Sequence, residues 1–146
     1  MFDILKHAHS GLRWLVLGLL LYAIYNAFTK WKSGNSFEEG DRKINLFTMI
    51  SVHTQILIGF AVYVIGQRYQ FGSETMKDSM LRFFAVEHLA MMLIAAILIT
   101  VGNAMSKKAA DDASKFKKTF IYFLIGLIVI IIAIPWPFRG FGNGWF

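Results

Sequence analysis

Four long apolar stretches constrain the fold of this chain more than any other feature of its sequence. They cover about residues 10–29, 44–66, 83–105 and 119–137, and the only Asp, Glu, Lys or Arg residues within them are Arg13 and Glu87. A helix needs about twenty apolar residues to cross the ~30 Å hydrocarbon core of a bilayer, and helices satisfy their own backbone hydrogen bonds in lipid. We therefore expect an all-α fold, an integral membrane four-helix bundle that forms a single transmembrane domain over residues 1–146.

The connections between these stretches are rich in turn-forming and charged residues. Gly34, Asn35 and Gly40 lie in the first connection, and Pro135 and Pro137 end the fourth stretch. Connections of roughly a dozen residues favour an up-down-up-down topology. The first stretch lacks a cleavage site of the Ala-x-Ala type, so we expect it to be retained as a membrane span and not removed as a signal peptide.

Most of the basic residues lie in these connections. The net charge of +6 would suggest nucleic acid as a partner of a soluble protein, but here the charge follows the alternation of the spans and we expect no such partner. Nine Lys and Arg residues lie around the connections after the first and third stretches, against six on the opposite side. Basic residues concentrate on the cytoplasmic side of membrane proteins. The sequence thus predicts a multi-pass protein in the lipid bilayer of a bacterial inner membrane, with both termini on the periplasmic side.

The chain contains no cysteine. This excludes disulfides, thiolate zinc sites, Cys-ligated iron–sulfur clusters and covalent attachment of a c-type haem. Any cofactor must therefore be held by histidine, methionine or carboxylate side chains.

Two histidines lie inside the apolar stretches, His53 in the second and His88 in the third. Ionisable groups within a membrane are costly and by default mark a functional site, and imidazole is an axial ligand of haem iron. At ~1.5 Å per residue, His53 lies ~15 Å from the inner face, counted from Lys43, and His88 lies ~9 Å from the outer face, counted from Arg82. The predicted depth offset of ~6 Å allows both imidazoles to bind one haem iron between the second and third helices, with His9 as an alternative ligand. The competing interpretation is that these histidines only pack against neighbouring helices.

Glu87 is the one carboxylate inside an apolar stretch, so it requires a partner, a proton or water. Arg13 and His9 are the closest candidate partners by depth, and His7 belongs to the same polar cluster. Two roles stay open for this group: an ion pair that locks the bundle, or a proton relay to a quinone near the outer surface. His7 and His9 would chelate one metal ion only in an extended segment, because residues two apart on a helix do not share a face.

The segments HAHSGLRW, SVHTQILIGFAVY, RFFAVEHLAMMLIAAILITVGNA and IPWPFR resemble a group of small bacterial four-helix inner-membrane proteins labelled cytochrome b-like. Each segment lies on or beside a different predicted helix, so the resemblance covers almost the whole chain. It implies a four-helix bundle with a b-type haem, and the matching positions are His9, His53 and His88. The fourth stretch has no histidine, so we expect at most one haem within the membrane, unlike in a two-haem membrane cytochrome b.

These features predict a haem b-binding electron-transfer protein or a subunit of a respiratory complex, which passes electrons between a quinol and a partner. We therefore expect an electron carrier or a subunit of a complex more than a stand-alone enzyme. One alternative is a non-catalytic accessory subunit that docks on other subunits of a larger membrane complex. Another is metal handling at the periplasmic face by His7, His9 and several methionines.

Overall fold

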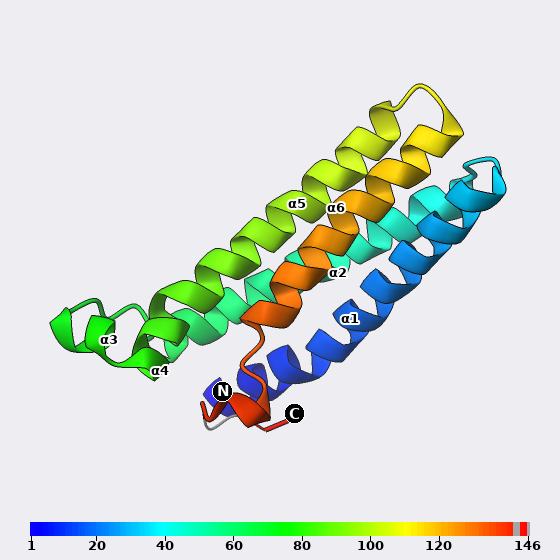
Figure 1. Ribbon diagram of the computed structural model, residues 1–146. Helices are drawn as coiled ribbons and strands as arrows, with labels where there is room; N and C mark the ends of the chain where they lie inside the picture. The colour runs from blue at the N-terminus through cyan, green and yellow to red at the C-terminus, as the bar shows by residue number, and fades with distance from the viewer. Residues whose placement is uncertain (142–143, 146) are drawn as a thin grey trace.

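The computed structural model describes residues 1–141 and 144–145. Within this part of the chain, four helices are long and apolar enough to cross a membrane. They pack as an up-and-down bundle (Figure 1), which confirms the predicted all-α membrane fold. The long helices are α1 (Phe2–Ser33), α2 (Glu39–Ile65), α5 (His88–Lys108) and α6 (Asp112–Ala133).

Short elements join α2 to α5 at the end of the bundle that also holds the N-terminus (Figure 1). They are α3 (Ser73–Lys77), α4 (Ser79–Arg82) and a π-helical turn, Phe83–Glu87, which runs directly into α5. After α6 the chain forms a 3-10 turn at Pro137–Arg139. This C-terminal segment folds back over the same end of the bundle, so residues from both ends of the chain lie close together there.

The four helices form a closed ring in the order α1, α2, α5, α6. Helix α1 packs on both α2 and α6, and α5 packs on α6 extensively and on α2 much less. The α5–α6 contact is close because Gly126 faces Ile99, where an added Cβ would lie 2.9 Å from Ile99 Cγ1. Small residues at such contacts let membrane helices approach closely. The core between the helices contains Leu20, Ala23 and Phe123, which are completely buried.

Large apolar side chains also cover the outside of the bundle. Leu21, Tyr25, Leu57, Ile97 and Ile132 are each more than half exposed. Contiguous apolar surface of this extent is rare on soluble monomers. It is the surface that a lipid bilayer would cover.

Helix α1 is longer, and two of the connections are shorter, than the sequence predicted. Helix α1 begins at Phe2 and not near residue 10, and only residues 34–38 separate it from α2. The segment 107–118, predicted as a solvated connection, is mostly helical, with only residues 109–111 between α5 and α6. Two local features allow such tight turns: Gly34 adopts φ 69° after α1, and Asp111 caps α6 by accepting a hydrogen bond from Ser114 N at 2.8 Å. Hydrogen bonds from Ser114 hold the pKa of the Asp111 carboxyl below its usual value.

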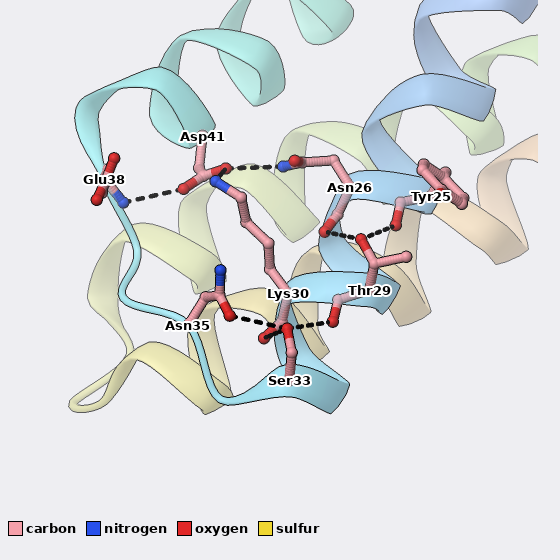
Figure 2. A network of polar contacts seen from close by, with 8 residues as sticks. All are labelled: Tyr25, Asn26, Thr29, Lys30, Ser33, Asn35, Glu38 and Asp41. Atoms are coloured by element: carbon pink, nitrogen blue, oxygen red, sulfur yellow. Dashed lines mark hydrogen bonds and ion pairs between the residues drawn. The ribbon is translucent and has the colours of Figure 1, made fainter.

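A buried polar network joins α1 to α2 at the end of the bundle opposite the N-terminus (Figure 2). Its centre is Asp41, which is 2% exposed. One oxygen of Asp41 accepts hydrogen bonds from Asn26 Nδ2 at 2.7 Å and Lys30 Nζ at 2.8 Å, and the other accepts from Glu38 N at 3.0 Å. The carboxylate thus begins α2 and ties it to the last turns of α1.

Candidate functional site

A partly open cavity of about 160 Å³ lies at the end of the bundle that holds the N-terminus. All four long helices contribute to its wall, so it lies inside the bundle. Much of its wall is apolar, with Val16, Val52, Ile56, Leu93 and Ile130 among its lining residues. Its polar lining residues are Lys6, His9, Ser10, Arg13, Gln55, Tyr63, Arg68 and His88.

Two histidines from different helices meet in this cavity, His9 on α1 and His88 at the start of α5. Their ring centroids are 6.3 Å apart and their planes are inclined by 81°. Both rings line the cavity, and both residues are only partly accessible. The structure therefore brings together His88 and the histidine that the sequence suggested as an alternative ligand.

The end of α6 fixes the His88 ring. His88 Nδ1 lies 2.7 Å from the carbonyl oxygen of Ala133, the last residue of α6. Carbonyl groups in the last turn of a helix lack a partner within the helix, and Pro137, four residues after Ala133, has no N–H to offer. Because a carbonyl can only accept, Nδ1 carries the proton and the Nε2 of a neutral His88 keeps its lone pair. This is the arrangement that orients a histidine for metal binding.

A π-helical turn directly precedes His88. The backbone N–H of His88 donates to Phe83 O, five residues earlier. Tyr63 of α2 donates its hydroxyl to Ala85 O at 3.1 Å and so occupies one of the carbonyls in this turn. π-Helical turns inside α-helices are rare and often occur at functional sites. Here the turn sets the rotation at which α5 presents His88 to the cavity.

The His9 ring lies against Gly59 of α2. A Cβ added at Gly59 would lie 2.7 Å from His9 Cε1, so only glycine leaves room for the imidazole there. Gln55, one turn earlier on α2, donates from Nε2 to the carbonyl oxygen of His9 at 2.8 Å. The His9 ring has no hydrogen-bond partner within the described part of the chain, and its Nδ1 is buried.

Three residues of the cavity wall carry buried polar atoms without a hydrogen-bond partner. The atoms are His9 Nδ1, Arg13 Nε and Gln55 Oε1, and within the described residues they are the only buried side-chain nitrogen or oxygen atoms in this state. Such atoms are rare in native proteins, and each calls for an explanation such as a bound group. Their concentration in one cavity marks it as the candidate site.

The structure does not bring the predicted pair of His53 and His88 together. His53 Nε2 lies 2.8 Å from the hydroxyl of Thr100, and Thr100 is twelve residues beyond His88 in the same helical run. This places the two rings ~18 Å apart along α5, whereas two ligands of one iron lie on either side of it. The depth estimate failed because it placed the membrane boundary at Lys43 and Arg82, although the helices continue past both residues.

The predicted partners of Glu87 are also wrong. Its carboxylate pairs with Arg82, with Nε and Oε1 2.7 Å apart, and both side chains are more than a third exposed. Arg13 instead donates to the carbonyl oxygen of Trp145 at 2.6 Å and lies against the rings of Trp14 and Trp136. Glu87 is therefore held by a neighbour on its own helical run, at an edge of the bundle.

His7 does not join the site. It is exposed on α1 and is not among the residues that line the cavity. Because α1 is helical from Phe2 onward, His7 and His9 point to nearly opposite faces and cannot chelate one ion. Among the described residues, no group of three or more His, Cys, Asp or Glu side chains is placed to hold a metal ion.

Gly59 was not predicted from the sequence as part of the site. A signal was nevertheless present, since Val52, Gln55, Gly59 and Tyr63 recur at spacings of three and four residues. This spacing indicates one face of a helix. A glutamine on an otherwise apolar face indicates a polar group on the neighbouring helix. A glycine on the same face indicates that a neighbouring residue packs closely against it.

The comparisons with known proteins identify no relative. No protein-family model matches the chain, and neither a curated protein nor a solved structure matches it.

Proposed function

We propose that this protein binds one b-type haem in the cavity, with His9 and His88 as the two axial ligands, and that it carries electrons within a membrane. The observation that supports this most is the separation of 6.3 Å between the two imidazole centroids. An imidazole nitrogen binds a first-row metal at ~2 Å, and the ring centroid lies ~1 Å further out. Two imidazoles on opposite sides of one iron therefore have centroids roughly 6 Å apart.

The donor set of the cavity fits such a group. Both proposed ligands are imidazoles, which in the neutral form have an available lone pair, and one is oriented through its Nδ1 by a backbone carbonyl. The unpartnered Nδ1 of His9 and the space above Gly59 are consistent with a ring poised for a ligand. The remaining wall is mainly apolar, which excludes competing water and helps to set the iron potential.

The cavity is small, and the proposed ligand must therefore enlarge it. Its volume of about 160 Å³ is below the ~300–1,000 Å³ of typical small-molecule sites. The macrocycle therefore requires side chains to move outward. Phe60 is 53% exposed and lines the cavity, and Met92, which also lines it, has a flexible unbranched side chain. Both can move without disturbing the completely buried core.

We further propose that the protein resides in a bacterial inner membrane with the cavity near the periplasmic face. The support is the distribution of charge: nine Lys and Arg residues lie toward the end with the α1–α2 and α5–α6 turns, and six toward the end with the cavity. Basic residues favour the cytoplasmic side. In this orientation the electron donor and acceptor would be a membrane quinol and a further membrane subunit.

Spectroscopy of histidine variants tests the ligand pair. The wild type, produced with ample haem, should show the visible spectrum of low-spin six-coordinate haem b. His9→Ala and His88→Ala should each lose the haem or convert it to a high-spin form, because one axial nitrogen is removed. The matched control is His53→Ala, which removes the same side chain from a site bonded to Thr100 and should keep the spectrum.

Two outcomes would contradict the proposal. A low-spin spectrum that is unchanged in both His9→Ala and His88→Ala would show that these residues are not the ligands. A wild type that binds no haem would remove the electron-transfer function altogether. The accessory-subunit role would then be the better account of the chain.

A further inference from the structure

Every charged residue that lines the cavity is basic. Lys6, Arg13 and Arg68 contribute to the wall, and no Asp or Glu is among the described residues that line it. Neither Lys6 nor Arg68 forms an ion pair with any described residue, although Asp3 is only three positions from Lys6 on α1. Glu87, which directly precedes His88, is already paired with Arg82. The cavity thus carries positive charge that the chain itself does not balance.

Two of these cations lie on the side of the cavity nearest the end of the bundle. Lys6 is one turn closer than His9 to the N-terminal end of α1, and Arg68 follows the C-terminal end of α2. Both side chains are exposed. The rest of the wall is largely apolar. A ligand that fits this pattern has an apolar body and one negatively charged edge.

The backbone next to Arg68 adopts a strained conformation. Gln67, the residue before it, adopts φ 51°, a left-handed conformation that non-glycine residues rarely adopt. The N–H of Arg68 donates to Tyr63 O at 3.0 Å, which closes the end of α2. The guanidinium then lies 5.0 Å from the centre of the Phe84 ring. Stacking of this kind engages the face of the guanidinium and leaves its N–H groups free to bind a carboxylate in a bidentate manner.

We infer that Lys6 and Arg68 bind the two carboxylates of the macrocycle, so that its charged edge lies toward the end of the bundle and its apolar edge lies between α2 and α5. This inference rests on the proposed haem site and adds to it the orientation of the ligand. The buried Arg13 guanidinium, whose Nε has no partner, adds positive charge on the side of the cavity next to α6.

Binding of two forms of the macrocycle tests this inference with the full-length protein in detergent. The dissociation constant is measured by absorbance titration for protohaem and for its dimethyl ester, in which both carboxylates are neutralised. The double variant Lys6→Gln/Arg68→Gln should bind protohaem about tenfold more weakly than the wild type, since partly exposed ion pairs contribute modestly. Its affinity for the dimethyl ester should be unchanged.

The matched control is Lys107→Gln/Lys108→Gln, which removes the same charge from the opposite end of the bundle. It should bind both forms like the wild type. Unchanged binding of protohaem by the Lys6/Arg68 variant, or an equal loss of affinity for both forms, would overturn this inference while leaving the histidine ligands intact. Absence of a low-spin spectrum in the wild type with either form would instead overturn the proposed function, and the inference with it.

Discussion

At the scale of single residues, Gly59 determines how closely α1 can approach α2 beside the site. Its missing side chain leaves room for the His9 imidazole, which lies where a Cβ would approach its Cε1 to 2.7 Å. The atoms in contact belong to a ring whose backbone carbonyl is also held by Gln55.

Gly59→Ala should therefore displace His9 from its position opposite His88. We expect the haem-loaded protein to change from a low-spin to a high-spin spectrum, with at least a tenfold loss of haem affinity, which corresponds to about 1.4 kcal/mol. Visible spectroscopy measures the first effect and haem titration the second.

Gly18→Ala is the matched control for this substitution. Gly18 is also inside a long helix, but nothing lies within 4 Å of a Cβ added there. The variant should keep the low-spin spectrum and gain slightly in stability, since alanine favours helix over glycine by up to ~1 kcal/mol. A low-spin spectrum in Gly59→Ala equal to that of Gly18→Ala would contradict the role of Gly59.

At the scale of elements, the α1–α2 turn depends on one buried carboxylate. Asp41 accepts hydrogen bonds from α1 through Asn26 and Lys30 and from the backbone of Glu38 (Figure 2). Two helices are therefore aligned by a residue at the start of the second one. The alignment reaches the cavity, because α1 and α2 supply His9 and Gly59.

Asp41→Ala should lower the free energy of unfolding by about 1–3 kcal/mol, because it removes a buried acceptor and leaves three partly buried donors without their partner. Unfolding in mixed micelles, followed by circular dichroism, measures the change. Glu39→Ala is the control, since it removes an exposed ion pair with Arg42 on the same helical turn and should have no measurable effect. Equal stability of Asp41→Ala and the wild type would show that the network does not hold the turn.

The helices themselves were predictable from sequence, but their relative depth was not. The lengths of the apolar stretches predicted four spans of about the right length, because each span must cross the same thickness of lipid. The depth of a residue was counted from the nearest charged residue, and this rule failed at Lys43 and Arg82, which lie within helical runs. An error of one or two turns in each helix was enough to pair His88 with His53 in place of His9.

The π-helical turn at Phe83–Glu87 adds a second reason why the site could not be predicted in full. It changes the rotation of α5 relative to a regular helix, and no residue type marks such a turn. The contact between His9 and His88 depends on this rotation and on the position of Gly59. The sequence thus identified His9 and His88 as candidate residues, whereas only the packed structure shows that they lie close together.

At the scale of the whole molecule, the bundle has two chemically different ends. One end carries the tight α1–α2 and α5–α6 turns and most of the basic residues. The other carries the cavity, the short helices α3 and α4, and an aromatic cluster in which Trp14, Trp136 and Trp145 contact one another. Tryptophan is enriched where a membrane meets water, so this cluster is consistent with an interfacial position for the cavity.

The charge asymmetry predicts the orientation of the bundle in the membrane. Reporters fused after Phe37 and after Ala110, in the two tight turns, should lie in the cytoplasm. A reporter fused after Ser73, at the start of α3, should be exported. The reason is that moving Lys and Arg across a membrane is costly and biosynthesis retains them on the cytoplasmic side. The reverse pattern would place the His9–His88 cavity at the cytoplasmic face, and its electron partners would then have to be sought on that side of the membrane.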